Sequence, residues 1–342
     1  MRTIDFRSDT QTLPSPNMLK AIQTAKLGDD VTHEDPTVND LEKFGAELLG
    51  KESSVLVSSG TMGNLIGVLI HCNRGDEVIA GAMSHICRGE AGGISVLGGV
   101  AIQPINTHTD GTLPLDDIET AIKPDDYHFP ITKLISVENT HNATGGKPLT
   151  PSYMNKVKSL AKKHNLKIHV DGARLFNAAI ALETPVKELV QDAETVSICL
   201  SKGLSAPVGS LLCGSEEDII KARRIRKMLG GGMRQAGIIA AAGKIALTEM
   251  VERLAEDHSN ARKLALGLSE INGIEIEPKE LPTNLVFFKV PEGRSKEFAT
   301  KLGEKGIKVG EKEDSRWRLV THYGITSDDI DYALEVINNV FE

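Results

Sequence analysis

The sequence contains few aromatic residues, few cysteines and no long apolar run. Aromatic residues make up 4% of the 342 residues, and the four cysteines form neither a Cys-x-x-Cys pair nor a ligand spacing with histidine. We therefore expect no metal site and no disulfide. No segment approaches the roughly 20 apolar residues of a membrane span, and the start MRTIDFRSDT lacks the apolar stretch of a signal peptide. These features favour a cytoplasmic protein that does not contact a membrane.

Positive charge is also scarce. Lys and Arg total 39 against 47 Asp and Glu, giving a net charge of −8, and the one basic run, Lys221 to Lys227, follows a helical pattern. We therefore expect no nucleic-acid partner. With 40% hydrophobic and 25% charged residues, the composition is that of a globular protein and not of a disordered or fibrous one. A chain of this length exceeds one ordinary core, so two lobes are expected.

Apolar strand patterns and helical patterns alternate along much of the chain. Residues 54–60 (SVLVSSG) predict a buried strand, residues 61–72 a helix and residues 76–82 (DEVIAGA) the next strand. The alternation continues with strands at 133–139, 166–173, 195–201 and 210–215 and a helix over 154–164. It predicts an α/β fold with a mainly parallel central sheet flanked by helices. Ligands of such sheets bind where strands end.

The last part of the chain has a different organisation. A long helical stretch over 237–271 is followed by strand patterns at 273–277, 284–290, 306–310 and 316–322. We predict a smaller α/β lobe in this region. The expected division is a large domain over residues 1–247 and a small C-terminal domain over residues 248–342, with the boundary inside regular structure.

A lysine and an aspartate follow two of the predicted strands. Lys202, in LSKGLSAPVGS, is followed by small residues that leave room for a bulky neighbour. A lysine so placed can lose its proton and form an imine, although most lysines after a strand point into solvent. Asp171 ends the strand KIHVD, where a carboxylate could keep a pyridinium nitrogen protonated or only cap the turn. The pair predicts a pyridoxal phosphate site.

Two glycine-rich segments could bind the phosphate of such a cofactor. In SSGTMGN, Gly60 permits a close turn, and Thr61 offers an amide and a hydroxyl at a helix N-terminus. The segment is neither a Walker loop nor Gly-x-Gly-x-x-Gly, and taken alone it also fits an ordinary helix start. The segment GGGMRQAG places Arg234 where it could reach a phosphate, either in its own subunit or in a neighbouring one.

Taken in order, these segments resemble the threonine aldolase family of pyridoxal-phosphate enzymes. The resemblance extends over nearly the whole chain and implies the aspartate-aminotransferase-like fold (fold type I), with the smaller α/β domain at the C-terminus. Its most specific pieces are DFRSDTQT, DPTVNDLE, SSGTMGN, SHI, ENTHNATGG, HVDGARLFNAA, LSKGLSAPVGS, MLGGGMRQAG and RLVTH.

The resemblance implies roles for the residues that would hold the cofactor. By this resemblance, Lys202 forms the imine with the cofactor aldehyde and Asp171 meets the ring nitrogen. Gly60 and Thr61 bind the phosphate. Further cofactor contacts implied in the same way are Ser201, Arg174, Arg234 and His85.

The resemblance also implies roles at the substrate. His85 stacks on the cofactor ring and is a candidate base for the substrate hydroxyl, directly or through water. Arg318 is the expected clamp for the substrate carboxylate, because a guanidinium binds a carboxylate at two points. Ser8 and Arg174 are expected to assist it. His128 matches a family position near the β-carbon of the substrate.

One segment departs from the family pattern. Relatives often have a Tyr-Gly pair where this chain has Thr32 and His33. This change affects the expected shape of the substrate pocket.

The expected function is retro-aldol cleavage of L-threonine, L-allo-threonine and related β-hydroxy amino acids to glycine and an aldehyde. Another pyridoxal-phosphate enzyme on the same fold, either a β-eliminating lyase or an aminotransferase, is the alternative, because fold does not fix the reaction. A non-catalytic pyridoxal-phosphate-binding protein and a cofactor-free lysine aldolase on a barrel are further alternatives. Where this chain has glycines 230–232 beside Arg234, the resemblance implies a homo-oligomer, a dimer or a dimer of dimers, whose active sites are completed by a neighbouring subunit.

Overall fold

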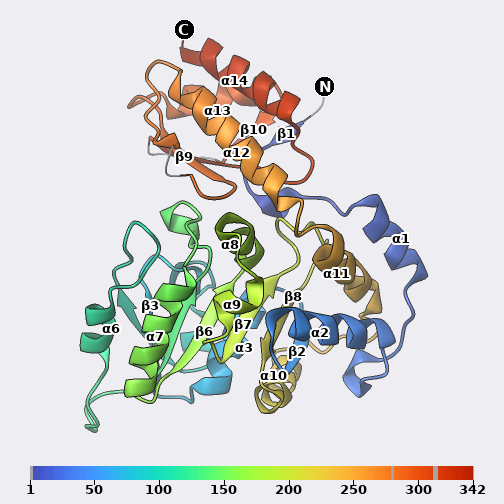
Figure 1. Ribbon diagram of the computed structural model, residues 1–342, viewed down its shortest axis with the longest axis vertical. Helices are drawn as coiled ribbons and strands as arrows, with labels where there is room; N and C mark the ends of the chain where they lie inside the picture. Colours follow the sequence, from blue (N-terminus) through green and yellow to red (C-terminus); the bar gives the residue numbers. More distant parts are fainter. Residues whose placement is uncertain (1–2, 279–280, 311–314, 342) are drawn as a thin grey trace.

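Figure 1 shows the computed structural model, which describes residues 3–278, 281–310 and 315–341. A larger lobe contains a seven-stranded sheet, and a smaller lobe lies beside one edge of it (Figure 1). The first and the last residues that the structure describes both lie in the smaller lobe. Within the described residues, no helix combines the length and the apolar composition that crossing a membrane requires.

The sheet of the larger lobe consists of β2 (Ser53–Val57), β3 (Asp76–Gly81), β4 (Ala101–Ile105), β5 (Ile131–Glu138), β6 (Lys167–Gly172), β7 (Thr195–Cys199) and β8 (Ser210–Gly214). Their order across the sheet is β2-β8-β7-β6-β5-β3-β4. The strands from β7 to β4 run parallel, whereas β8 is antiparallel to both of its neighbours. Glu138 pairs with Asp171, so the carboxyl ends of β5 and β6 meet at one edge.

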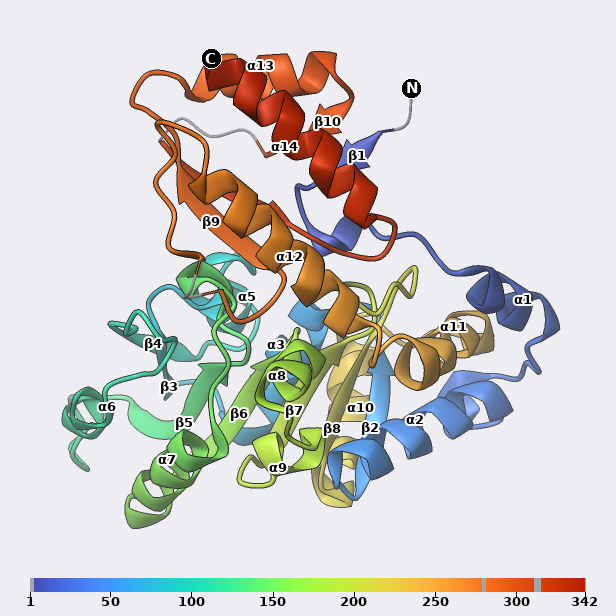
Figure 2. The same ribbon diagram turned by 45° about the horizontal axis from the view of Figure 1, so that its top comes forward.

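Helices cover both faces of this sheet. α3 (Gly60–His71) and α10 (Glu216–Met228) pack on one face, and α2 (Pro36–Leu49), α7 (Pro151–Lys163), α8 (Leu175–Leu182) and α9 (Val186–Val190) lie on the other (Figure 2). α1 (Pro16–Thr24) and α2 both pack against α11 (Gly237–Glu249). The short elements of this lobe are η1 (Asp9–Gln11), η2 (Asp30–Thr32), α4 (His85–Arg88), α5 (Gly93–Val96), α6 (Leu115–Ala121) and η3 (Asn142–Thr144).

Glycines bring α3 unusually close to the sheet. A Cβ atom at Gly63 would lie 2.3 Å from Ser197 Oγ, and one at Gly67 would lie 2.4 Å from the ring of His169. Neither position tolerates a side chain, because both distances are below normal van der Waals contact. The N-terminus of the helix is capped by Ser59, whose hydroxyl accepts a hydrogen bond from the Met62 amide. The first turn of α3 therefore lies against the end of the sheet.

The smaller lobe has its own core. It contains α12 (Leu254–Ser269), α13 (Ser295–Glu304) and α14 (Ser327–Phe341), together with β9 (Leu285–Lys289) paired antiparallel to β11 (Arg316–Val320). Phe298 packs edge-on against Trp317, with ring centroids 4.8 Å apart. β1 (Ile4–Asp5) pairs in parallel with β10 (Ile307–Lys308).

The two-lobed α/β architecture and the mainly parallel sheet confirm the predicted fold class. Ile4 and Phe6 pack in the core of the smaller lobe, because β1 pairs with β10. The long helical stretch is interrupted between α11 and α12, and α12 passes from one core to the other. The predicted strand at 273–277 is wrong, since Glu275 forms only an isolated bridge with Lys289.

Candidate active site

The carboxyl edge of the sheet brings Lys202 and Asp171 into one region. Lys202 follows β7 in a turn that returns as β8, and its carbonyl accepts hydrogen bonds from the Ser205 amide and the Thr12 hydroxyl, each at 2.9 Å. The second of these ties the N-terminal segment to the turn. The Lys202 charge lies within electrostatic range of Asp9 and His85. The lysine therefore stands between the sheet edge and the N-terminal segment.

Asp171 presents a buried carboxylate at the end of β6. The residue is 4% exposed. Its Oδ1 accepts a hydrogen bond from the Ala173 amide at 3.1 Å, and its Oδ2 accepts one from Asn64 Nδ2 at 2.9 Å. Among residues 3–278, 281–310 and 315–341, no lysine or arginine forms a salt bridge with it. A buried carboxylate without a cationic partner is costly. It suits a ligand that brings a protonated nitrogen.

An imidazole and a second carboxylate stand next to Asp171. One ring nitrogen of His85 and one carboxylate oxygen each of Glu90 and Asp171 lie within 4.8 Å of one another. Glu90 Oε1 is hydrogen-bonded to His85 Nδ1 at 2.8 Å and accepts from Asn64 Nδ2 at 2.7 Å. The hydrogen bond with Glu90 raises the pKa of His85, and burial raises the pKa of Glu90. The His85 ring keeps a side-chain exposure of 45%, so it faces an accessible space.

Glu138 fixes the two loops that border this cluster. Its Oε2 accepts from the His85 amide at 2.7 Å and its Oε1 from the Asn142 amide at 2.8 Å. Burial, and then the charge of Asp171, raise the pKa of Glu138 to about 7. One side chain at the end of β5 therefore sets the positions of both His85 and Asn142.

Arg174 and Asp9 form a buried ion pair beside Ser8. Arg174 Nε donates to Asp9 Oδ2 at 2.7 Å and Arg174 Nη2 to Asp9 Oδ1 at 2.8 Å. Burial alone would raise the pKa of Asp9, but the charge and hydrogen bonds of Arg174 outweigh it and the pKa is lowered. Ser8 Oγ donates to Asp9 Oδ1 at 3.4 Å. This pair holds the N-terminal segment against the end of β6.

Arg318 lies close to Arg174, and its guanidinium donates to a side-chain amide oxygen and to a backbone carbonyl. Its Nη1 donates to Asn142 Oδ1 at 2.9 Å, and Arg174 Nη1 donates to the same oxygen at 3.4 Å. Burial, followed by repulsion from Arg174, lowers the pKa of Arg318. Within the part of the chain that the structure describes, no acidic side chain forms a salt bridge with Arg318. The arrangement leaves one positive charge for an anionic group.

The two glycine-rich segments also meet. A Cβ atom at Gly231 would lie 2.6 Å from Met62 Sδ, which places the loop before α11 against the first turn of α3. Gly60 and Thr61 begin this turn, and helix-start amides lack intrahelical partners. Arg234 is exposed and pairs with Asp29 at 2.9 Å. The turn offers donors for an anion beside the end of β7.

The segment that departs from the family pattern lies on the surface beside Arg234. The Asp30 amide donates to the Arg234 carbonyl at 2.9 Å. Thr32 and His33 are exposed, and His33 has a positive φ of 61°. These two side chains therefore lie on the loop that contacts the second glycine-rich segment.

His128 is not brought to the other predicted residues within one chain. It precedes β5, whereas Asp171 lies level with Glu138 at the far end of that strand. The seven residue steps along β5 from Ile131 to Glu138 span roughly 23 Å, so the two ends of the strand are far apart. His128 is exposed, and its Nδ1 is hydrogen-bonded to Asp126 at 2.7 Å. Ser201, by contrast, lies at the end of β7 next to Lys202.

Several residues of the site were not predicted. Asp9, Asn64 and Asn142 lie inside segments that carried the family resemblance, so those segments held a signal for them. Glu138 also lies in such a segment, ENTHNATGG, whereas Glu90 had no comparable signal, because its role depends on neighbours that only the fold supplies.

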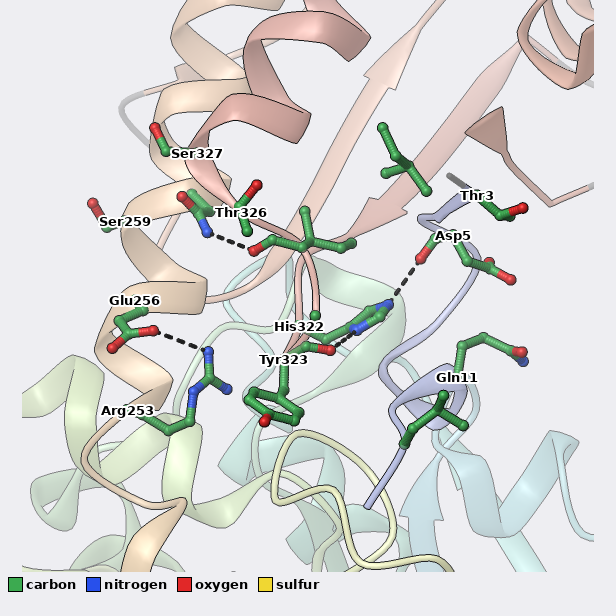
Figure 3. A pocket seen from close by; sticks show the side chains of 15 residues that line it. Thr3, Asp5, Gln11, Arg253, Glu256, Ser259, His322, Tyr323, Thr326 and Ser327 are labelled. Carbon is green, nitrogen blue, oxygen red and sulfur yellow. Dashed lines mark hydrogen bonds and ion pairs between the residues drawn. The ribbon is translucent and has the colours of Figure 1, made fainter. Parts of the chain in front are cut away.

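The small lobe holds the N-terminal segment in place. A cavity of about 810 Å³ lies between this segment, α12 and the loop after β11 (Figure 3). The His322 ring crosses this gap, with Nε2 hydrogen-bonded to the Asp5 carbonyl at 2.8 Å and Nδ1 to the Tyr323 carbonyl at 2.9 Å. The segment that carries Ser8 is therefore attached to the same loop region that follows Arg318.

Comparison with known proteins identifies the family. The family model described as beta-eliminating lyase matches residues 5–291. The chain is 47% identical to the probable low-specificity L-threonine aldolase 2 of Arabidopsis thaliana, over 100% of this chain and 98% of that protein. It is 48% identical to the low specificity L-threonine aldolase of Escherichia coli O157:H7, over 96% of each. The chain belongs to the threonine aldolase family of beta-eliminating lyases.

A solved structure supports the fold of this threonine aldolase family member. The threonine aldolase of Leishmania major superimposes with a TM-score of 0.83 at 21% identity, covering 99% of this chain and 100% of that one. At this identity the likeness concerns the fold alone. The predicted fold class and family are both confirmed.

Proposed function

We propose that the protein is a low-specificity L-threonine aldolase that uses pyridoxal 5′-phosphate. It cleaves the Cα–Cβ bond of L-threonine, L-allo-threonine and related β-hydroxy amino acids, releasing glycine and an aldehyde. The observation that carries this proposal is that Lys202 and the buried Asp171 carboxylate lie at the same edge of the sheet, while neither Asp171 nor Arg318 forms a salt bridge within the described residues. Relatives with this name are similar over nearly their whole length.

The residues present fit this cofactor. Asp171 is a buried carboxylate that lacks a cation among the described residues, as a partner for a protonated ring nitrogen should be. The helix start at Gly60 and Thr61 suits a phosphate. Lys202 stands at the end of the adjacent strand. When bound through Lys202, the cofactor supplies an electron sink for the electron pair of the broken Cα–Cβ bond.

Arg318 fixes the substrate by its carboxylate. Arg174 is already neutralised by Asp9, so Arg318 supplies the free charge and Arg174 a further donor. Arg318 Nη1 and Arg174 Nη1 both donate to Asn142 Oδ1. A substrate carboxylate accepts these two hydrogen bonds in place of Asn142. Holding the carboxylate on this side orients the Cα–Cβ bond toward the reacting position.

His85 accepts the proton of the substrate hydroxyl, directly or through water. Its Nδ1 donates to the ionised Glu90, which leaves Nε2 with a lone pair when the ring is neutral. The raised pKa of His85 makes it a stronger base. Asp171 meanwhile holds the proton on the cofactor ring nitrogen.

The proposed reaction is tested by incubating the protein and pyridoxal phosphate with L-threonine and no keto acid. We expect glycine and acetaldehyde in equal amounts, also from L-allo-threonine, because the clamp contacts groups that both isomers share. Pyruvate and ammonia from L-serine would support a β-eliminating lyase instead. Turnover only after addition of a keto acid would support an aminotransferase. No turnover of any β-hydroxy amino acid by the cofactor-loaded protein would refute the proposal.

The role of His85 predicts a shift in pH dependence. The base must be neutral, so kcat/KM falls as the pH drops through the His85 pKa. The hydrogen bond with Glu90 raises that pKa, and Glu90→Gln removes the negative charge. We expect the acid limb of the kcat/KM profile to move to lower pH.

The matched control is Glu119→Gln, because Glu119 forms a surface pair with His164 at 2.9 Å. This variant should leave the profile unchanged. An acid limb that stays in place in Glu90→Gln would show that His85 is not the base.

We further propose a cytoplasmic homo-oligomer whose active sites are completed by a neighbouring copy. Exposed apolar side chains support a subunit contact, among them Val96 at 74%, Met228 at 72% and Tyr127 at 94% exposure. Tyr127 precedes His128, which lies too far from Asp171 to act in its own chain. Contact of His128 with the substrate therefore requires the active site of another copy.

A further inference from the structure

A chain of buried polar side chains leads away from Asp171 beneath α3. Asn64 Oδ1 lies 3.1 Å from His169 Nε2, His169 Nδ1 lies 2.9 Å from Thr195 Oγ1, and Thr195 Oγ1 lies 3.1 Å from His71 Nε2. Asn64, His169 and Thr195 are each at most 1% exposed. The chain starts at the Asp171 carboxylate, which accepts from Asn64.

The direction of every hydrogen bond in this chain is determined. Asn64 Nδ2 faces two carboxylates, so Oδ1 faces His169 and must accept a proton from Nε2. Burial lowers the pKa of His169 to about 4, so the ring is neutral and its Nδ1 accepts from the Thr195 hydroxyl. Thr195 has no second proton, and it therefore accepts from His71 Nε2.

All of these donors point toward Asp171. Successive hydrogen bonds of one direction polarise one another, and donors aimed at a carboxylate favour its charged form. His169 and Asp171 are two residues apart on β6 and share one face of the sheet, the face that α3 covers. Gly67 leaves the space that the His169 ring fills. The close packing of α3 is therefore what allows the chain to form.

We propose that His71, Thr195, His169 and Asn64 form a positioning relay that holds the Asp171 carboxylate in place as the acceptor for the cofactor ring nitrogen. The four residues act through Asp171 and do not touch the substrate. His71 lies seven residues beyond Asn64 on α3, roughly 10 Å along the helix. This inference rests on the proposed function, because it assigns the relay to the same cofactor.

Thr195→Val tests the relay by removing the hydroxyl that links His169 to His71. This variant removes the hydroxyl without contacting Asp171, so His169 Nδ1 loses its donor and the series of aligned donors is interrupted at His169. With pyridoxal phosphate labelled with ¹⁵N in the ring, we expect the ring-nitrogen signal to move toward the unprotonated form. Loss of one hydrogen bond should weaken cofactor binding roughly two- to tenfold. Thr195→Ser restores the hydroxyl and should restore both values.

The matched control is Thr132→Val, since Thr132 is also a buried strand threonine, on β5, and is hydrogen-bonded to Glu77 of β3 at 2.9 Å. It should leave both readouts unchanged. If Thr195→Val fails to fold by circular dichroism, His71→Leu interrupts the relay at its outer end, and His71→Gln keeps the donor.

The outcomes separate the relay from the proposed function. A native protein that does not bind pyridoxal phosphate overturns the proposed function. A native protein that binds it, with a ring-nitrogen signal equal in the native, Thr195→Val and His71→Leu proteins, overturns the relay. The same shift in Thr132→Val would also overturn it, because a general loss of packing would then explain the change.

Discussion

Lys202→Ala is expected to lose nearly all aldolase activity while the protein still folds. The side chain projects from a turn whose backbone bonds, to Ser205 and Thr12, use only the Lys202 carbonyl. Removing a residue that bonds covalently during catalysis reduces kcat by at least roughly three orders of magnitude in well-studied enzymes. Initial rates of glycine release from L-threonine measure the effect.

A second measurement on the same variant reports the covalent bond itself. Borohydride treatment of the cofactor-loaded native protein should fix a pyridoxyl group to Lys202, detectable by peptide mass, and Lys202→Ala should lack this mass. Lys221→Ala, which removes a surface lysine paired with Glu217, is the control and should behave as the native protein. Label on a different lysine, or retained turnover in Lys202→Ala, would contradict the assignment.

The sheet and its strand ends could be predicted from sequence because their signals are local. Apolar runs bounded by turn residues mark β6 and β7, and a strand end places Asp171 and Lys202 at the ligand-binding edge. β4 was not predicted, since it lies at the edge of the sheet and contains Pro104. β8 is antiparallel because the chain returns directly after β7. The spacing of apolar residues along a strand does not indicate the direction of the strand.

The partners of the site residues could not be predicted because they are distant in sequence. Asp9 and Arg174 are 165 residues apart, and His71 and Thr195 are 124 apart. Each of these residues alone fits an ordinary surface or core position. The pairing of β1 with β10 is also a long-range event, and it places Phe6 in the smaller lobe. Sequence patterns therefore located the strand ends, whereas the fold determined their electrostatics.

The two lobes meet at the proposed substrate clamp. Arg318 comes from β11 in the smaller lobe, while Arg174 and Asn142 come from the larger one. The N-terminal segment with Asp9 joins them, because it pairs with the smaller lobe and binds Arg174. The clamp therefore depends on how the lobes sit together, as well as on the residues themselves.

Arg318→Leu is expected to lower kcat/KM for L-threonine roughly 10²- to 10³-fold, the cost of losing one partner of a desolvated charge pair. The loss should appear mainly in KM if Arg318 only binds the carboxylate, and in kcat as well if it also orients the Cα–Cβ bond. Arg318→Lys keeps the charge but loses the two-point geometry, so it should recover only part of the activity.

The matched control for the clamp is Arg316→Leu, two residues earlier on β11. Arg316 is exposed and lies over the Phe287 ring at 4.6 Å, outside the group formed by Arg174 and Asn142. This variant should keep the native kcat/KM. Cofactor absorbance should be unchanged in all three variants without substrate, because the Arg318 guanidinium donates to Asn142 Oδ1 and the Arg7 carbonyl, and neither residue is a proposed cofactor contact. Equal losses in Arg318→Leu and Arg316→Leu would mean that the effect arises from β11 itself, and the assignment of Arg318 as the carboxylate clamp would be wrong.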